Sequence, residues 1–101
     1  MKLDTVTNSR RSTTEDILRI SRSEDRAGFV RLFIVFAPRV KAYLCHQGLS
    51  PEAAEDLAQE TLINVWRKAG TFDPSKASAS AWIFTIARNL RGDGLRREGQ
   101  P

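Results

Sequence analysis

The sequence has almost none of the side chains from which disulfides and metal sites are built. It contains one cysteine and one histidine, and these residues, Cys45 and His46, are neighbours in the chain. A lone cysteine cannot form a disulfide within the chain, which indicates a reducing compartment. A zinc ion needs three or four protein ligands, so we expect neither zinc nor another bound metal.

Long hydrophobic runs and catalytic motifs are missing as well. No stretch of about 18 apolar residues occurs, so we expect no membrane-spanning helix and no membrane partner. Residues 1–16 lack the apolar core of a signal peptide, which favours a cytoplasmic protein. Because the chain has no serine–histidine–acid set and no glycine-rich phosphate loop, we expect neither an enzyme nor a cofactor.

What the sequence does contain is helical periodicity, which predicts an all-α fold. We expect a small four-helix bundle with three long helices and a short N-terminal one. Residues 1–11 are polar and without a pattern, which predicts a disordered tail. We expect residues 12–97 to form one domain. Residues 98–101 are expected to be a tail or the start of a linker. The short first helix should start at Ser12 or Thr13.

The second helix should start near Glu24 and is apolar almost all round, which is typical of a buried central helix. Pro38 should kink or break this helix because it lacks an N–H and crowds the preceding turn. Gly48 should cap its end.

Ser50 and Pro51 predict the start of a third helix, which should run to about Ala69 with Gly70 as its cap. A loop over residues 71–80 should follow. The fourth helix should begin near Ser78 or Ser80 and end at Leu90 or Arg91, because Gly92 and Gly94 weaken a helix there.

Charge is divided unequally between the last two helices, although the net charge of the chain is only +4. Between residues 50 and 66 all four charged residues are acidic, whereas residues 67–97 carry seven basic residues against two acids. Acidic groups repel nucleic acid and basic groups attract it, so this division predicts two different partners.

On a helical wheel, one side of the third helix is apolar and should face the core, with Leu57 among its residues. The opposite side has a single aliphatic residue, Ile63, among polar ones, as expected of an anchor inside a polar protein interface. This side consists of Asp56, Gln59, Glu60, Ile63 and Arg67.

The loop and the fourth helix have the chemistry of a nucleic-acid surface. The loop combines an apolar anchor, a positive charge and hydroxyls, which suits an extruded base beside a phosphate; these residues are Phe72, Ser75, Lys76, Ser78 and Ser80. On the fourth helix, Trp82 has the spacing of a core residue. Phe84 should lie on the outer side with Thr85, Arg88 and Arg91, where it could stack on a base or cover an interface.

Six groups of residues resemble, in identity and order, region 2 of bacterial sigma factors of the small extracytoplasmic-function (ECF) class. The groups are Ala54–Asp56–Leu57, Gln59–Glu60, Trp66–Arg67–Lys68, Phe72–Asp73–Pro74, Ala81–Trp82 and Ile86–Ala87–Arg88–Asn89. With the preceding helix included, the resemblance covers about two thirds of the chain. The glycine that is usual in the family's loop is replaced here by a residue within Lys76–Ala77–Ser78.

The resemblance implies two partners and a site for each. Asp56, Gln59 and Glu60 match positions that bind the clamp coiled coil of the RNA polymerase β′ subunit. The loop matches one that holds a base flipped out of the non-template single strand of the promoter minus-ten element. Thr85, Arg88 and Asn89 match positions that contact this element.

The resemblance further implies an anti-sigma factor as a regulatory partner. It also implies a second domain, region 4, so we expect the chain to be part of a longer protein. Primary sigma factors have a tryptophan pair where this chain has Thr85–Ile86, so we expect weak DNA melting.

Two other functions are compatible with the residues. The apolar second helix could dock a regulatory protein, which would make the domain a protein-interaction module. A duplex-reading helix-turn-helix domain is the other alternative, although that motif uses a turn of three or four residues, shorter than the loop expected here.

Overall fold

The computed structural model describes residues 13–22 and 25–98, and every regular element in them is helical. A short helix spans 13–22 and is followed by α2 (Arg26–His46), α3 (Pro51–Lys68), the 3₁₀ turn η1 (Ala69–Thr71) and α4 (Ala79–Glu98). The predicted all-α fold of three long helices and one short one is confirmed. The predicted tail over residues 1–11 and residues 99–101 lie outside the described residues.

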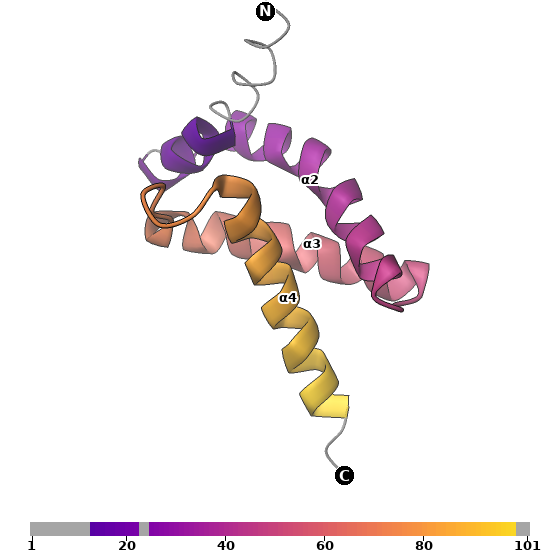
Figure 1. Cartoon of the computed structure of the whole chain (residues 1–101). Coiled ribbons are helices and arrows are strands. Elements are labelled where there is room, and N and C mark those ends of the chain that lie inside the picture. The colour runs from indigo at the N-terminus through magenta and orange to yellow at the C-terminus, as the bar shows by residue number, and fades with distance from the viewer. Residues whose placement is uncertain (1–12, 23–24, 99–101) are drawn as a thin grey trace, which may run out of the picture.

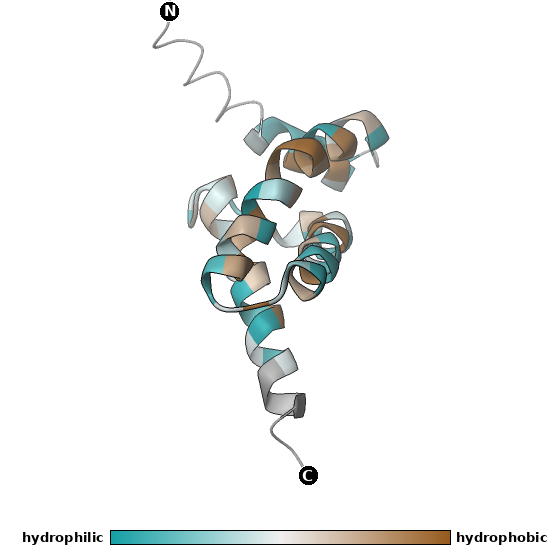
Figure 2. Ribbon diagram, turned by 90° about the vertical axis from the view of Figure 1, so that its right-hand side faces the viewer, coloured by the Kyte–Doolittle hydropathy of each residue, from teal (hydrophilic) through white to brown (hydrophobic). Residues whose placement is uncertain are grey.

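The helix α3 lies at the centre of the arrangement. It packs against both α2 and α4, and α4 crosses it and extends well beyond it toward the C-terminus (Figure 1). Hydrophobic residues gather in the upper part of the molecule, where the short helix and the start of α2 lie (Figure 2). The extended half of α4 is largely neutral to hydrophilic.

Local sequence signals set the junction between α2 and α3. Gly48 has a φ of 102°, and its N–H donates to the Cys45 carbonyl at 3.0 Å. The N–H of Leu49 donates to the Leu44 carbonyl at 3.1 Å, which completes a Schellman motif. The side chain of Ser50 then caps α3 by accepting the N–H of Ala53 at 3.2 Å. Both predicted caps are therefore confirmed.

The hydrophobic core is built from one buried stripe on each helix. It contains Ile17 and Ile20 of the short helix, and its large members from the long helices include Leu32, Phe36, Leu44, Leu62 and Ile83. On α3 the predicted core side is confirmed with one exchange, since Leu57 is only half-buried and Leu62 is fully buried.

A charged pair fastens the short helix to α2. The Arg31 side chain donates from Nε to Asp16 Oδ2 at 3.2 Å and from Nη2 to Asp16 Oδ1 at 2.7 Å. Asp16 is buried, and this bidentate geometry satisfies both of its oxygens. Gly28 lies beside the pair, and a side chain there would meet Asp25 Oδ2 at 2.9 Å.

The structure corrects two predictions for α2. Pro38 does not break the helix, which continues through it; its ring is on the exposed side, where water can reach the carbonyl that lost its donor. The predicted kink at Pro38 stays a prediction. The helix is also not buried all round, since Val30 is 52% and Ile34 is 67% exposed. An almost uniformly apolar helix gave no signal for which side faces the core.

Two predicted helix ends are wrong as well. Gly70 does not adopt a left-handed cap and instead lies within the 3₁₀ turn. The last helix does not stop at Leu90 or Arg91 but passes through Gly92 and Gly94 to Glu98. Glycine lowers helix propensity by only about 1 kcal/mol, which flanking helical residues can offset.

Candidate interaction surfaces

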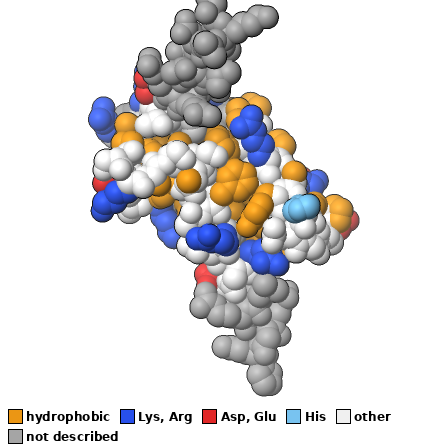
Figure 3. All heavy atoms as spheres, viewed as in Figure 1, with side chains coloured by type: hydrophobic (Ala, Val, Ile, Leu, Met, Phe, Trp, Pro, Cys, Tyr) orange, Lys and Arg blue, Asp and Glu red, His pale blue; other side chains and the backbone are white. Residues whose placement is uncertain are grey.

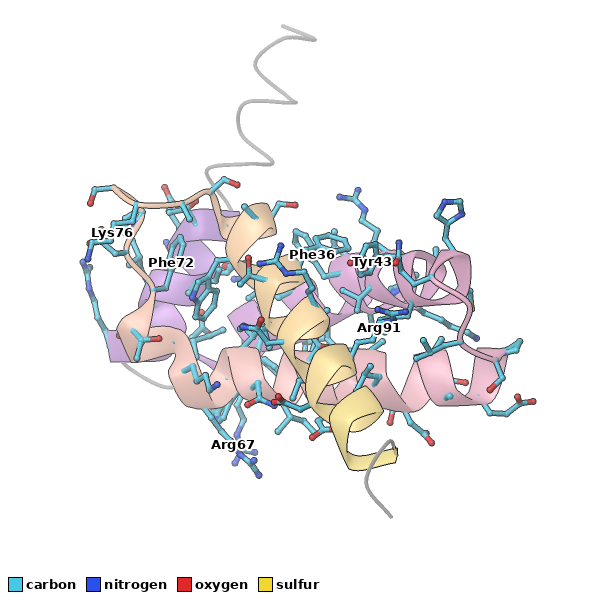
Figure 4. All side chains as sticks on the ribbon, turned by 60° about the horizontal axis from the view of Figure 1, so that its bottom comes forward. Phe36, Tyr43, Arg67, Phe72, Lys76 and Arg91 are labelled. Atoms are coloured by element: carbon cyan, nitrogen blue, oxygen red, sulfur yellow. The ribbon has the colours of Figure 1, made fainter. Side chains whose placement is uncertain are left out.

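The outer face of α3, defined as Asp56, Gln59, Glu60, Ile63 and Arg67, is exposed at every position. The helix brings these predicted contact residues to one side, and Ile63 is 44% exposed among the polar groups. Arg67 points away from the body of the protein on the side of α3 remote from the loop (Figure 4). The face therefore combines two carboxylates, an amide, a guanidinium and one apolar anchor.

Two hollows join this face to exposed apolar residues of α2. A cavity of about 410 Å³ lies between the helices, with Ile34, Pro38 and Gln59 among its lining residues. A second one of about 320 Å³ brings Ile63 together with Val30. The outer face of α3 thus continues onto α2. The sequence did not predict this continuation, because the almost uniformly apolar composition of α2 indicated a buried helix.

Asp73 organises the loop between α3 and α4. Its Oδ1 accepts the Ser75 hydroxyl at 2.6 Å and the Ser75 N–H at 2.9 Å. These two bonds lower the pKa of the Asp73 carboxyl from its ordinary value. The Asp73 carbonyl also accepts the N–H of Lys76 at 3.0 Å. No role was predicted for Asp73 beyond its place in a motif, although an Asp-Pro-Ser tripeptide is a recognised turn signal.

Phe72 and Lys76 have opposite environments within this loop. Phe72 is only 6% exposed, and its ring centre lies 5.1 Å from that of Trp82. It therefore anchors the loop in the core, and Trp82 packs at the core margin as its spacing predicted. Lys76 is exposed at the outer end of the loop (Figure 4). The positive charge is presented to solvent while the aromatic ring is not.

The two predicted loop serines near α4 serve different roles. The Ser78 hydroxyl oxygen accepts the N–H of Ala81 at 3.1 Å, which makes Ser78 the cap of α4. Ser80 is in the first turn of the helix and is exposed. Both lie beside a cavity that also involves α2.

The outer face of α4, defined as Thr85, Arg88 and Asn89, is exposed as predicted. The Thr85 hydroxyl donates to the Ala81 carbonyl at 2.8 Å, so its proton is already used within the helix. Among the described residues no carboxylate pairs with Arg88. Arg88 and Asn89 therefore present a charge and an amide that are available to a ligand.

Phe84 and Arg91 differ from their predicted positions on an open surface. Phe84 is half-buried and meets Tyr43 of α2 edge to face, with ring centres 5.5 Å apart. Arg91 donates to the Gln47 carbonyl at 3.3 Å. Both residues join α4 to α2. Of the two roles predicted for Phe84, the structure therefore supports the covering of an interface, here the one between α4 and α2. Residues far apart in sequence make these contacts, and no local pattern could have predicted them.

The side of the molecule that carries α4 combines apolar groups with positive charge. Apolar side chains gather at its centre, and lysine and arginine side chains surround them (Figure 3). This is the combination that nucleic-acid-binding surfaces use.

Other chemistries find no support among the described residues. Within residues 13–22 and 25–98 no three histidine, cysteine or acidic side chains come close enough to hold a metal ion. In the same part of the chain, no helix has the length and apolar character needed to cross a bilayer.

Comparison with known proteins identifies one family over most of the chain. Residues 32–100 match the family model described as Sigma-70 region 2. The ECF RNA polymerase sigma factor RpoE of Cereibacter sphaeroides is 53% identical over 77 residues, which cover 76% of this chain and 42% of RpoE. The ECF sigma factor SigK of Mycobacterium tuberculosis is 31% identical over 87 residues, covering 86% of this chain and 46% of SigK.

A solved structure shares the fold. The crystal structure of Rhodobacter sphaeroides SigE in complex with the anti-sigma ChrR matches with a TM-score of 0.79 and 44% identity. The match covers 82% of this chain and 54% of the SigE chain. The chain thus spans about half the length of the relatives that it matches.

Proposed function

The chain belongs to the sigma-70 region 2 family, in its ECF class, and we propose that it directs transcription initiation by binding core RNA polymerase and promoter DNA through two separate surfaces. The outer face of α3 binds the β′ clamp helices. The loop and the outer face of α4 bind the non-template strand of the minus-ten element as single-stranded DNA. This role is recruitment and recognition rather than catalysis.

The observation that carries the proposal is the separation of these surfaces on one shared hydrophobic core. Asp56 and Glu60 are exposed on α3, whereas Lys76 and Arg88 are exposed on the loop and α4. Carboxylates beside a DNA strand would repel its phosphates, so the acidic face suits a basic protein partner instead. Separation allows both partners to bind at once, as initiation requires.

The polymerase surface has the arrangement of a protein interface. Ile63 supplies an apolar anchor, and Asp56 and Glu60 form a charged rim that pairs with arginine-rich helices. The hollows that bring Gln59 and Ile63 next to exposed α2 residues extend the area available to a helical partner. Buried apolar contacts then supply affinity, while the rim sets register and association rate.

Charge and hydrogen bonding have different roles on the proposed DNA surface. Arg88 and Lys76 bind phosphates of any sequence, whereas Asn89 offers both a donor and an acceptor to a base edge. The Asp73–Ser75 bonds hold the loop in shape before DNA arrives, which lowers the entropic cost of binding an extruded base.

An anti-sigma factor is a further proposed partner. The similar SigE protein was solved in complex with the anti-sigma ChrR. A protein that covers the outer face of α3 would compete directly with polymerase, and such competition would regulate initiation.

The test of the polymerase surface is charge reversal on α3. The double variant Asp56→Lys/Glu60→Lys should lose binding to core polymerase in a calorimetric titration while its helicity and melting temperature stay unchanged. The matched control is Glu15→Lys/Asp93→Lys, which changes net charge equally at exposed positions on the short helix and α4, off this face. Undiminished affinity of the first variant would overturn the assignment.

The test of the DNA surface compares single-stranded with duplex minus-ten DNA in filter binding, with core polymerase present. The single strand should bind more tightly. Tight binding of duplex by the chain alone would favour a helix-turn-helix reader instead. Against that alternative, α3 ends at Lys68 and α4 begins only at Ala79, far beyond a three- or four-residue turn.

A further inference from the structure

Arg88 and Asn89 of the proposed DNA surface lie where the close packing of α4 ends. Ala87 is fully buried, whereas the next two residues, Arg88 and Asn89, are exposed. Beyond them Gly92 and Gly94 carry no side chain, and a Cβ built at either position meets nothing within 4 Å. The direction in which Arg88 and Asn89 point therefore depends on what holds α4 on their C-terminal side.

Two contacts with α2 hold this part of the helix. The Arg91 side chain donates to the Gln47 carbonyl at 3.3 Å. The Phe84 ring meets the Tyr43 ring edge to face, with 5.5 Å between the ring centres. Figure 4 shows Arg91 and Tyr43 where α4 passes α2. Phe84 and Arg91 are seven residues apart, and an α-helix returns to within about 20° of the same side after seven residues, so the two contacts together set how far α4 can rotate about its own axis.

The surroundings of Arg91 favour a role in this contact over a contact with DNA. Gln47 is the C-cap of α2, where the free carbonyls of a helix carry partial negative charge and attract a cation. Arg91 is half-buried, and its Nε is buried without a hydrogen-bond partner among the described residues. A buried N–H without a partner costs free energy, so the net stabilisation from this guanidinium is small. Its position is better explained by what it holds in place.

We propose that Arg91 is a positioning residue for promoter recognition: its bond to the end of α2 fixes the rotation of α4 that directs Asn89 at a base edge. Arg91 itself does not contact the strand. The proposal rests on the function proposed above, in which Asn89 reads a base and Arg88 binds a phosphate. Base reading depends on this positioning more than phosphate binding does, because hydrogen bonds to a base edge require a fixed geometry, whereas a charge attracts phosphate from a range of directions.

The test is Arg91→Ala in the chain bound to core polymerase, with cognate and base-substituted minus-ten single strands in competition. The preference for the cognate base at the position that Asn89 reads should fall roughly tenfold, which is the size of one lost bidentate base contact. Asn89→Ala added to Arg91→Ala should have little further effect on this preference, because the contact is already lost. Arg91→Lys keeps a cation that can donate to the Gln47 carbonyl, so it should retain most of the preference.

The dependence of binding on salt separates positioning from a direct phosphate contact. If Arg91 only positions α4, Arg91→Ala should leave the slope of log affinity against log salt unchanged. A slope that becomes shallower by about 0.7, with all strands weakened alike, would make Arg91 a phosphate contact and overturn the proposal. Arg22→Ala is the matched control, since it removes an exposed arginine of the short helix, and it should change neither the preference nor the slope.

Tyr43→Leu tests the second contact without a change of charge. It removes the aromatic partner of Phe84, so it should lower the same preference and leave the salt slope unchanged. Full preference in either Arg91→Ala or Tyr43→Leu, even with a lower melting temperature, would overturn the positioning role alone. If Asn89→Ala and Arg88→Ala have no effect on any strand, the proposed function itself fails and the positioning role fails with it.

Discussion

Hydroxyl groups on the proposed DNA surface differ in what their neighbours leave them free to do. The protons of Thr85 and Ser75 are donated to the Ala81 carbonyl and the Asp73 carboxylate, at 2.8 and 2.6 Å. Each of these oxygens can therefore only accept a further bond. Exocyclic amines of adenine and cytosine are donors, so these two residues favour bases that carry them. The Ser78 hydroxyl is the opposite case. Its oxygen already accepts the Ala81 N–H, so its proton is the group left to bond to a base.

Arg88 and Asn89 are adjacent and exposed, yet their substitutions should have different effects on DNA binding. Arg88→Ala should weaken every single-stranded oligonucleotide alike, because a phosphate charge carries no sequence information. Asn89→Ala should instead change which minus-ten sequence is preferred, by about 1–3 kcal/mol at one base. The measurement is competition between cognate and base-substituted strands with polymerase present. An equal loss for all strands in Asn89→Ala would show that α4 only positions the DNA.

The Asp73 carboxylate should make the shape of the loop dependent on pH only under acidic conditions. Its pKa is lowered from 3.8 chiefly by the Ser75 hydroxyl bond and next by the Ser75 N–H bond. The stabilisation is thus fully present above pH 3.8 and is lost as the pH falls through the lowered pKa. The Ser75 amide resonance in an NMR titration should report a midpoint below 3.8. Asp73→Ala should abolish this transition and weaken binding of the strand at neutral pH. A midpoint at or above 3.8 would contradict the bonded loop.

At the scale of the element, two glycines of this chain should respond oppositely to the same substitution. Gly92 lies inside α4 with an ordinary helical backbone, and a built side chain there meets nothing within 4 Å. Gly92→Ala should therefore raise the free energy of unfolding by about 0.5–1 kcal/mol. Gly48 has a φ of 102°, where an L side chain is strained. Gly48→Ala should therefore lower the free energy of unfolding by about 1 kcal/mol. Thermal and urea unfolding of both variants measure these changes. Destabilisation by Gly92→Ala would mean that α4 does not continue through this position.

The helix α2 has three distinct sides, which its composition conceals. One side is buried against α3, a second is exposed and apolar at Val30 and Ile34, and a third carries Arg39 and Tyr43 toward α4. The second side joins the outer face of α3, and the third borders the cavity at the start of α4. A single helix thus contributes to both proposed surfaces.

For the whole molecule, the number of free cations predicts a weak dependence of DNA binding on salt. Arg91 is engaged with the Gln47 carbonyl, so among the described side chains of the loop and α4 the cations available to phosphates are Lys76 and Arg88. At about 0.7 counterions released per contact, two contacts give a slope of log affinity against log salt of about −1.4. Titrations of the chain with a single strand at several salt concentrations measure this slope. A slope steeper than about −4, or nanomolar binding of random duplex, would contradict the assignment.

The sequence by itself determined those features whose partners lie within a few residues. Ser50 caps α3 and Gly48 ends α2 because each bond spans only three to five residues. The outer face of α3 follows from helical spacing, since the opposite side is plainly apolar. Trp82 was recognised as a core residue for the same reason.

Tertiary structure alone decided what depends on how the helices cross. Nothing local distinguishes Ile34, which is 67% exposed, from Leu32, which is buried, because both are aliphatic residues of one apolar helix. The Phe84–Tyr43 and Arg31–Asp16 contacts join residues 41 and 15 positions apart, and they exist only because α2 meets α4 and the short helix at those points. Helix propensity is a sum of small local terms, whereas which side of a helix is buried, and what lies beside it, is fixed by packing against its neighbours.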